Sequence, residues 1–271
     1  MAGDRCLDVE KGSDGRFEAD PQAIYDRWDE FRSWASSVDE APGERLDPCL
    51  LGSPAPRPPQ VFAIGLNYSE HAAEAGFEAP GTAPPVFTKF PTCITGPYGD
   101  VVLPRGGHTD WEVELVVVIG RRAERVPAVD AWKHVAGLAV GQDLSERVSQ
   151  MAGPAPQFGL AKSFPRFGPV GPWLVTPDEF DDPNDLALSC SINGEVVQDG
   201  RTSQLLFGVP AILEHLSAVL PLLPGDVVFT GTPPGVGMGR VPPRWLAPGD
   251  ELVSSVEGIG ELRHRFVAQE D

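Results

Sequence analysis

The chain has 271 residues, and its 39 acidic against 21 basic side chains give it a formal net charge of −18. At roughly 150 residues per domain, this length predicts one or two domains with a self-sufficient core. The negative field opposes phosphate backbones and acidic lipid surfaces, so we expect no nucleic-acid and no membrane partner. The four cysteines form no CxxC pair. With no apolar leader and no membrane-length apolar stretch, we expect a cytoplasmic protein without disulfides.

The first part of the chain predicts a small N-terminal unit. Apolar residues at helical spacing indicate a helix over 22–38, with Pro21 at its start. Residues 41–60 are rich in proline and glycine, which is typical of a linker. We therefore assign 1–57 to a small N-terminal domain with its linker, and 58–271 to the main, catalytic domain.

The main domain alternates short strands with short helices. With 30 glycines and 29 prolines, turns are frequent, which favours many short strands over a bundle of long helices. Strands are expected at 61–64, 86–89, 111–119 and near 251–256, and helices at 67–75, 128–136, 144–151 and 209–220. This pattern predicts an α+β fold built around antiparallel or mixed sheets.

Three acidic residues alternate at the start of the strongest predicted strand. Asp110, Glu112 and Glu114 are spaced i, i+2, so on a strand they share one face. Like charges on a half-buried face repel each other and lose hydration, and a bound cation would remove that conflict. Carboxylates without cysteine favour magnesium, manganese or calcium. The alternative is an edge strand whose acidic face lies in water.

Two further pairs of polar residues have both a chemical and a plain interpretation. Asp143 could join a metal site, or could cap a helix and form an i, i+4 ion pair with Arg147. His71 and Glu74 are spaced i, i+3 on a predicted helix, so the carboxylate can orient the imidazole as a general base. The alternative for this second pair is an exposed polar face.

A loop of threonine, proline and glycine follows the expected strand at 227–229. Residues 229–237 lack the lysine of a phosphate-binding loop, and their prolines disrupt a dinucleotide fingerprint. The loop could hold a substrate carboxylate with Thr232 and free backbone amides. Otherwise it is a tight connection.

Taken together, these stretches occur in the order seen in one family. The chain resembles the fumarylacetoacetate hydrolase family over about 61–265, and is similar to its bacterial subgroup of acylpyruvate and didehydro-deoxy-rhamnonate hydrolases. The stretches that carry the resemblance are Ile64-Gly65-Leu66-Asn67-Tyr68, 110–115, Ala161-Lys162-Ser163-Phe164, Asn193-Gly194-Glu195, 224–226 and Thr230-Gly231-Thr232-Pro233. The sequence departs from the family pattern at Gln142, Phe158, Ala161 and Pro165.

The resemblance implies a fold, a site and an assembly. The fold is the family's mixed β-sandwich roll, with a small N-terminal domain in front, expected as a homodimer. The implied metal ligands, for Mg²⁺ with Mn²⁺ or Ca²⁺ as alternatives, are Glu112, Glu114 and Asp143. The implied catalytic residues are His71, Glu74 and Lys162, and the implied substrate contacts are Arg147, Gln150 and Thr232.

The reaction implied by the resemblance is hydrolysis of a carbon–carbon bond in a 2,4-dioxo acid of the acylpyruvate type. Magnesium would polarise the oxo-acid end of this small-molecule substrate, and His71, oriented by Glu74, would deprotonate water. Lys162 would stabilise the developing negative charge. A decarboxylase, a keto–enol isomerase or a secondary-metabolite cyclase or lyase could use the same kind of site. A silent binding protein is disfavoured, since the expected ligand and dyad positions are all present.

Overall fold

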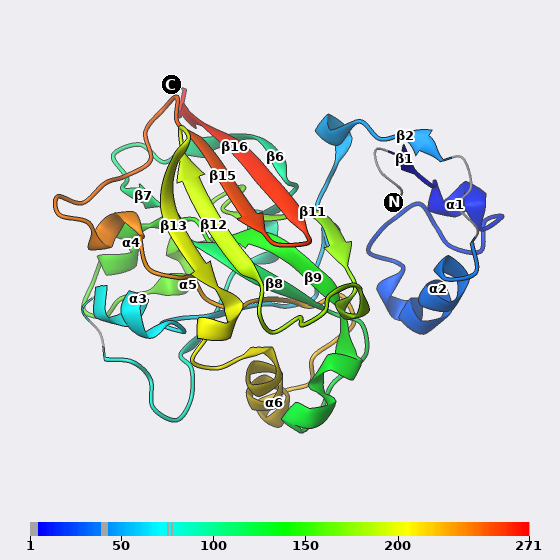
Figure 1. The fold of residues 1–271 in the computed structure, drawn as a ribbon. Coiled ribbons are helices and arrows are strands. Elements are labelled where there is room, and N and C mark those ends of the chain that lie inside the picture. The colour runs from blue at the N-terminus through cyan, green and yellow to red at the C-terminus, as the bar shows by residue number, and fades with distance from the viewer. Residues whose placement is uncertain (1–4, 39–42, 75, 77, 271) are drawn as a thin grey trace.

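Two curved sheets pack face to face in the computed structural model, which describes residues 5–38, 43–74, 76 and 78–270 (Figure 1). The larger sheet consists of β4 (Val86–Thr88), β3 (Val61–Ile64), β14 (Val227–Phe229), β8 (Val113–Ile119), β9 (Val135–Gln142), β11 (Gly168–Val175) and β5 (Ile94–Thr95), in that spatial order. The smaller sheet consists of β13 (Glu195–Arg201), β12 (Ala187–Ile192), β15 (Glu251–Val256), β16 (Gly260–Ala268) and β6 (Tyr98–Leu103).

Short strands and helices complete the fold. Two small ladders join β1 (Arg5–Cys6) to β2 (Glu44–Arg45) and β7 (Thr109–Asp110) to β10 (Ser145–Glu146). The helices are α1 (Val9–Gly12), α2 (Trp28–Ala35), α3 (Ser69–Glu74), α4 (Arg147–Met151), α5 (Phe158–Ala161) and α6 (Val209–Val219). Single 3₁₀ turns cover Tyr25–Arg27, Pro48–Leu50, Pro91–Cys93, Pro177–Glu179, Thr202–Gln204 and Gly237–Gly239, with a longer one at Ala128–His134.

Both sheets mix strand directions, so the α+β class with mixed sheets is confirmed. In the larger sheet β14 runs parallel to β3 but antiparallel to β8, and in the smaller one β16 runs parallel to β6 but antiparallel to β15. None of the helices in the described ranges is long and apolar enough to cross a membrane.

Strand β8 is buried on both faces and divides the core in two. Val113, Leu115 and Val117 face the smaller sheet, where they join the main hydrophobic cluster. Val116 and Val118 alternate with them and pack on the opposite face of the large sheet. Glu114 lies two and four positions before these two valines, so its carboxylate is on the same outer face.

The N-terminal segment covers one end of that outer face. Tyr25 and Trp28 pack with Val116 and Val118 in one cluster, and the Tyr25 hydroxyl donates to the Pro54 carbonyl at 2.9 Å. The segment lies beside the large sheet on the right of Figure 1, whereas α3, α4 and α5 lie at the opposite end. The acidic residues at the start of β8 therefore lie near these three short helices and away from the N-terminal segment. The domain boundary at 57/58 stays a prediction.

Several predicted elements differ from their expected bounds. The helices expected at 67–75 and 144–151 start at Ser69 and Arg147, and the helix expected at 128–136 is a 3₁₀ helix that ends at His134. The helix expected over 22–38 is shorter, with a 3₁₀ turn at Tyr25–Arg27 followed by α2 over Trp28–Ala35. The side chain of Asp20 accepts from the amide of Gln22 at 3.0 Å and holds the preceding residues in a turn. The strand expected over 111–119 starts at Val113, because the amide of Glu112 donates to the side chain of Gln142 instead of a strand partner. The first two residues of the linker expected over 41–60 lie outside the described residues.

Candidate active site

Three carboxylates meet where β8 and β9 lie side by side. Antiparallel pairing sets Val113 opposite Gln142, and the amide of Asp143 donates to the carbonyl of Glu112 at 2.9 Å. Glu112, Glu114 and Asp143 each contribute an oxygen to a group whose atoms lie within 4.8 Å of one another. All three residues are buried, so the alternative of an acidic face in water is wrong.

The acidic residues do not lie on one continuous strand, as the alternation had suggested. Asp110 belongs to the short ladder β7–β10, where it pairs with Ser145. Its carboxylate accepts from the amides of Gly237 at 2.6 Å and Met238 at 3.1 Å. The i, i+2 spacing thus brought the right side chains into one region, although the strand is interrupted at 111–112.

Three buried cations, Lys89, Lys162 and Arg147, surround the carboxylates. Lys162 Nζ lies 2.6 Å from Oε2 of Glu112 and 2.7 Å from Oδ2 of Asp143. Arg147 lies 2.7 Å from Oε1 of Glu112 and 2.8 Å from Oδ2 of Asp110. Although burial alone would raise it, these two cations lower the pKa of Glu112 to about 2.

Glu114 differs from the other carboxylates because it pairs with no cation among the described residues. It accepts a hydrogen bond from the amide of Gly231 at 2.7 Å. Burial, followed by the neighbouring charges of Asp143 and Glu112, raises the pKa of Glu114 well above its usual value. A carboxylate in this position favours a bound cation.

The residues present fit a divalent metal ion. The buried charges here are the four carboxylates of Asp110, Glu112, Glu114 and Asp143 against the three cations Lys89, Lys162 and Arg147. If all four are ionised, one negative charge is in excess, and Glu114 is the carboxylate that has no cationic partner among the described residues. Hard oxygen ligands without cysteine or histidine suit Mg²⁺, Mn²⁺ or Ca²⁺.

His71 and Glu74 lie on α3, one turn apart. His71 Nδ1 is 3.8 Å from Oε2 of Glu74 and finds no hydrogen-bond partner among the described residues, although it is buried. Glu74 accepts from the amide of Gly235 at 2.9 Å, which fixes its carboxylate. The separation is longer than a hydrogen bond, and catalytic pairs of this kind shorten when a ligand binds. The imidazole is only 7% exposed, so the alternative of an exposed polar face is wrong.

The three expected substrate contacts fall into two groups. Gln150 and Thr232 line the cavity described below, whereas Arg147 is not among its described lining residues and lies behind Glu112. The Thr232 hydroxyl donates to the carbonyl of Val113 at 2.8 Å, so it is already engaged. The roles of all three toward a substrate stay predictions.

The plain interpretation of Asp143 and the chemical interpretation of the loop after β14 both need correction. Among the described residues no ion pair joins Asp143 to Arg147, since each has buried partners elsewhere. The loop after β14 does not offer all its amides to a substrate. Those of Gly231, Gly235 and Gly237 donate to the protein's own carboxylates at Glu114, Glu74 and Asp110.

Sequence reasoning missed Lys89 and Gln142 as parts of this site. Lys89 lies at the end of β4, 54 positions before its partner Asp143, so no local spacing links them. The Gln142 side chain accepts from the amide of Glu112 at 2.9 Å and donates to Ser254 at 2.9 Å. Its presence had been noted only as a departure from the family pattern.

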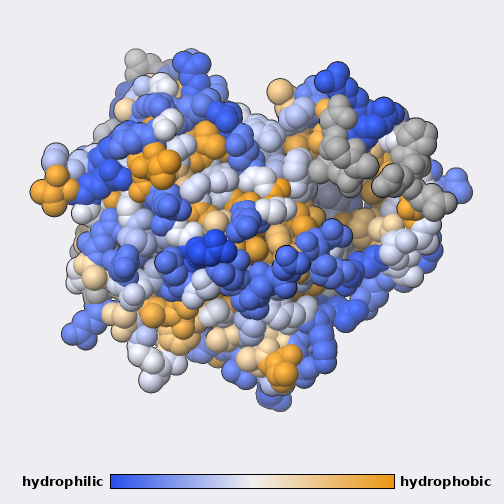
Figure 2. Space-filling model, in the orientation of Figure 1, coloured by the Kyte–Doolittle hydropathy of each residue, from blue (hydrophilic) through white to orange (hydrophobic). Residues whose placement is uncertain are grey.

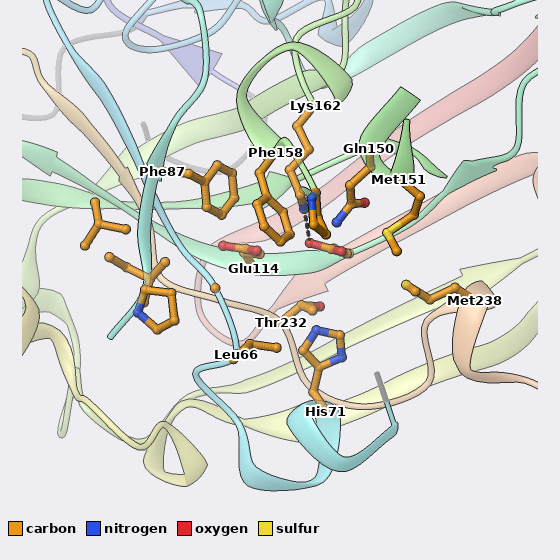
Figure 3. A pocket seen from close by; sticks show the side chains of 16 residues that line it. Leu66, His71, Phe87, Glu114, Gln150, Met151, Phe158, Lys162, Thr232 and Met238 are labelled. Atoms are coloured by element: carbon orange, nitrogen blue, oxygen red, sulfur yellow. Dashed lines mark hydrogen bonds and ion pairs between the residues drawn. The ribbon is translucent and has the colours of Figure 1, made fainter. Parts of the chain in front are cut away.

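The site opens into a cavity of about 310 Å³ (Figure 3). His71, Glu112, Glu114 and Lys162 are among the residues that line it. The rest of the wall is mostly apolar. Its further described lining residues are Ile64, Gly65, Leu66, Pro85, Val86, Phe87, Gln150, Met151, Pro156, Phe158, Thr232 and Met238.

This chain is similar to known proteins over most of its length. The family model of the fumarylacetoacetate hydrolase C-terminal domain matches residues 60–267. The human mitochondrial oxaloacetate tautomerase FAHD2A is 44% identical over 216 residues, which cover 79% of this chain and 68% of that protein. Its location belongs to that protein, and the cytoplasmic location expected for this chain stays a prediction.

Solved structures are also similar. An HpcE-like protein from Mycobacterium smegmatis superimposes with a TM-score of 0.95 at 55% identity, covering 100% of this chain and 96% of that one. Fumarylpyruvate hydrolase from Pseudomonas aeruginosa, solved with Mn²⁺ and pyruvate, gives a TM-score of 0.70 at 32% identity, covering 78% of this chain and 90% of that one.

Proposed function

This chain belongs to the fumarylacetoacetate hydrolase family, whose members are enzymes, and we propose that it is a divalent-metal-dependent hydrolase of 2,4-dioxo acids. In this proposal it cleaves an acylpyruvate to a 2-oxo acid and a carboxylic acid. The observation that carries the proposal is that the acidic centre and His71, with Glu74 behind it, face the same cavity.

Glu112, Glu114 and Asp143 would hold the ion, which when bound supplies a Lewis acid for the oxo-acid end of the substrate. We favour Mg²⁺, with Mn²⁺ or Ca²⁺ as alternatives. Use of Mn²⁺ is supported by the Pseudomonas aeruginosa relative, which was solved with that ion and pyruvate.

The chain's own residues then divide the proton and charge work. His71, held by Glu74, accepts a proton from water, and the resulting hydroxide attacks the 4-carbonyl carbon. The bond between C3 and C4 breaks, and C3 leaves with the electron pair as an enolate that is then protonated. Lys162 stabilises the negative charge of that enolate from the side of Glu112 and Asp143.

Two variants assayed on acetylpyruvate test the proposal. His71→Ala should lose roughly 10²–10⁴ in rate on acetylpyruvate, which is the usual contribution of a positioned general base. Glu74→Gln should lose less or a similar amount, and neither variant should release the metal. Undiminished cleavage of acetylpyruvate by His71→Ala would overturn the proposed mechanism.

A second candidate is keto–enol tautomerisation of a 2-oxo diacid, which is favoured by the name of the human relative at 44% identity. Tautomerisation needs no hydrolytic water. If it is the main reaction, the wild-type protein should interconvert the enol and keto forms of oxaloacetate faster than it cleaves any acylpyruvate. Mass analysis of the products separates both reactions from decarboxylation.

The homodimer is likewise a proposal, which light scattering on the purified protein tests.

A further inference from the structure

The cavity carries almost no positive charge that a second substrate carboxylate could use. Among its described lining residues, Lys162 and His71 are the side chains able to carry a positive charge. Lys162 already binds two carboxylates at 2.6 and 2.7 Å. His71 lies next to Glu74. Once a metal and the 2-oxo acid end are in place, the described lining residues offer no further cation.

The remaining wall is apolar and aromatic. Phe87 and Phe158 lie side by side, with ring centroids 5.3 Å apart. Figure 3 shows these rings on one side of Glu114 and Leu66 on the other, with Met151 and Met238 at the end nearer Gln150. Such walls bind alkyl or aryl groups by burial of apolar surface.

The segments that continue from this wall are also without cations. Residues 75–85 read AGFEAPGTAPP and residues 151–157 read MAGPAPQ, so neither contains lysine, arginine or histidine. Pro85, Met151 and Pro156 from these segments line the cavity. Whatever arrangement the two segments take around a ligand, they add at most the negative charge of Glu78.

We infer that the acyl group of the substrate is uncharged and apolar, a conclusion that rests on the proposed function. A carboxylate at its far end would be buried against aromatic rings and methionines, where no described lining residue offers it a further cation. Because an unpaired buried charge is strongly penalised, we expect a preference of at least about 100-fold for the uncharged acyl chain.

Turnover on a pair of substrates of equal length tests the inference. Butanoylpyruvate and succinylpyruvate differ by a terminal methyl in place of a carboxylate. With Mg²⁺ present, kcat/KM for butanoylpyruvate should exceed that for succinylpyruvate at least about 100-fold. Equal values, or a preference for the diacid, would overturn the inference and would indicate a cation supplied from elsewhere, such as a second copy of the chain.

A binding measurement separates failure of this inference from failure of the proposed function. 2-Oxoheptanoate and 2-oxoheptanedioate lack the 4-carbonyl and cannot be cleaved. Calorimetry on the Mg²⁺-loaded full chain should show tighter binding of the monoacid by at least tenfold. If this selectivity is found but no acylpyruvate is cleaved, the proposed function fails, while the preference of the cavity for an uncharged chain is retained. If the diacid binds as tightly, the inference fails whatever the reaction.

Introducing a positive charge at one wall residue provides the matched control. Met238 is unbranched and borders the cavity, so Met238→Lys adds a cation with little change of shape. This variant should shift the binding ratio toward 2-oxoheptanedioate by at least tenfold, whereas the neutral Met238→Gln should not. Equal shifts in both variants would show that polarity, and not the missing charge, sets the selectivity, which would contradict the inference.

Discussion

Lys89 places its ammonium nitrogen 2.6 Å from Oδ1 of Asp143, and both side chains are fully buried. The same nitrogen donates to the carbonyls of Lys162 and, at 3.2 Å, Phe167, so all three of its N–H groups are used. Lys162 holds the other oxygen of Asp143. The carboxylate is therefore fixed from two sides, and its orientation toward Glu112 and Glu114 does not depend on a substrate.

Loss of Lys89 should destabilise the protein severely. Lys89→Met removes one partner of a buried ion pair and leaves two backbone carbonyls without a donor, so we expect a loss of about 3–5 kcal/mol in the free energy of unfolding. Urea unfolding of the metal-free protein measures it. The control is Lys133→Met, which breaks an exposed ion pair with Asp130 and should leave the unfolding midpoint unchanged. A loss below 1 kcal/mol in Lys89→Met would contradict this account of the site.

Two isosteric substitutions in the metal site should have opposite effects on the metal-free protein. Glu112→Gln takes a partner from both Lys162 and Arg147, so it should lower the free energy of unfolding by about 1–3 kcal/mol. Glu114→Gln removes a buried charge that has no cationic partner among the described residues, so stability should stay equal or rise.

Both variants should nevertheless lose metal affinity, because each removes one of the three proposed carboxylate ligands. Calorimetric titration of the stripped protein with Mn²⁺ and Mg²⁺ checks this, and activity should disappear after treatment with EDTA. Full activity of the stripped protein would contradict the metal requirement, and unchanged Mn²⁺ affinity in Glu114→Gln would exclude Glu114 as a ligand.

Lys162 should contribute more to turnover than to substrate affinity. Its ammonium lies between Glu112 and Asp143, next to the place proposed for the enolate, and negative charge there is greatest in the transition state. Lys162→Met should lower kcat more than it raises KM, provided that metal titration shows a loaded site. A near-normal kcat with only a raised KM would show that the lysine serves binding alone.

The sequence was sufficient for the parts of the site that are local in the chain. Spacing i, i+3 brought His71 and Glu74 together on α3, and the acidic alternation identified Glu112 and Glu114. The family resemblance supplied Asp143, whose local pattern fitted a helix cap equally well. The predicted helix over 209–220 is found as α6, because its apolar stripe packs on the main core.

What the sequence could not supply depends on contacts between distant segments. Lys89 pairs with Asp143 only because β4 and β9 belong to one sheet, and the Gln142 side chain replaces a strand partner of Glu112. The spacing suggested that Arg147 pairs with Asp143 on a helix. Arg147 pairs instead with Asp110 on β7 and with Glu112, which lies between β7 and β8. Tertiary pairing decided each of these cases against local spacing.

A histidine far from the cavity should give the stability a measurable pH dependence. His264 on β16 is 1% exposed, and its Nε2–H donates to the carbonyl of Gly96 at 3.1 Å. Burial, with a smaller contribution from Arg166, lowers the pKa of His264 from 6.5 to about 4. The folded protein therefore keeps this imidazole neutral in a pH range where the unfolded chain protonates it.

The sign follows from the number of bound protons. Between pH 6.5 and about 4 the unfolded chain binds the additional proton, so the contribution of His264 is present above pH 6.5 and is lost as the pH falls. The shift corresponds to on the order of 3 kcal/mol.

His264→Gln can keep the hydrogen bond to Gly96 without the titration, so its free energy of unfolding should fall less between pH 6.5 and 4 than that of the wild type. Urea unfolding at half-unit steps of pH measures the difference. His108→Gln, which removes an exposed imidazole, controls for the loss of a histidine as such. Parallel curves for the wild type and His264→Gln would show that the buried imidazole does not drive the loss of stability in acid.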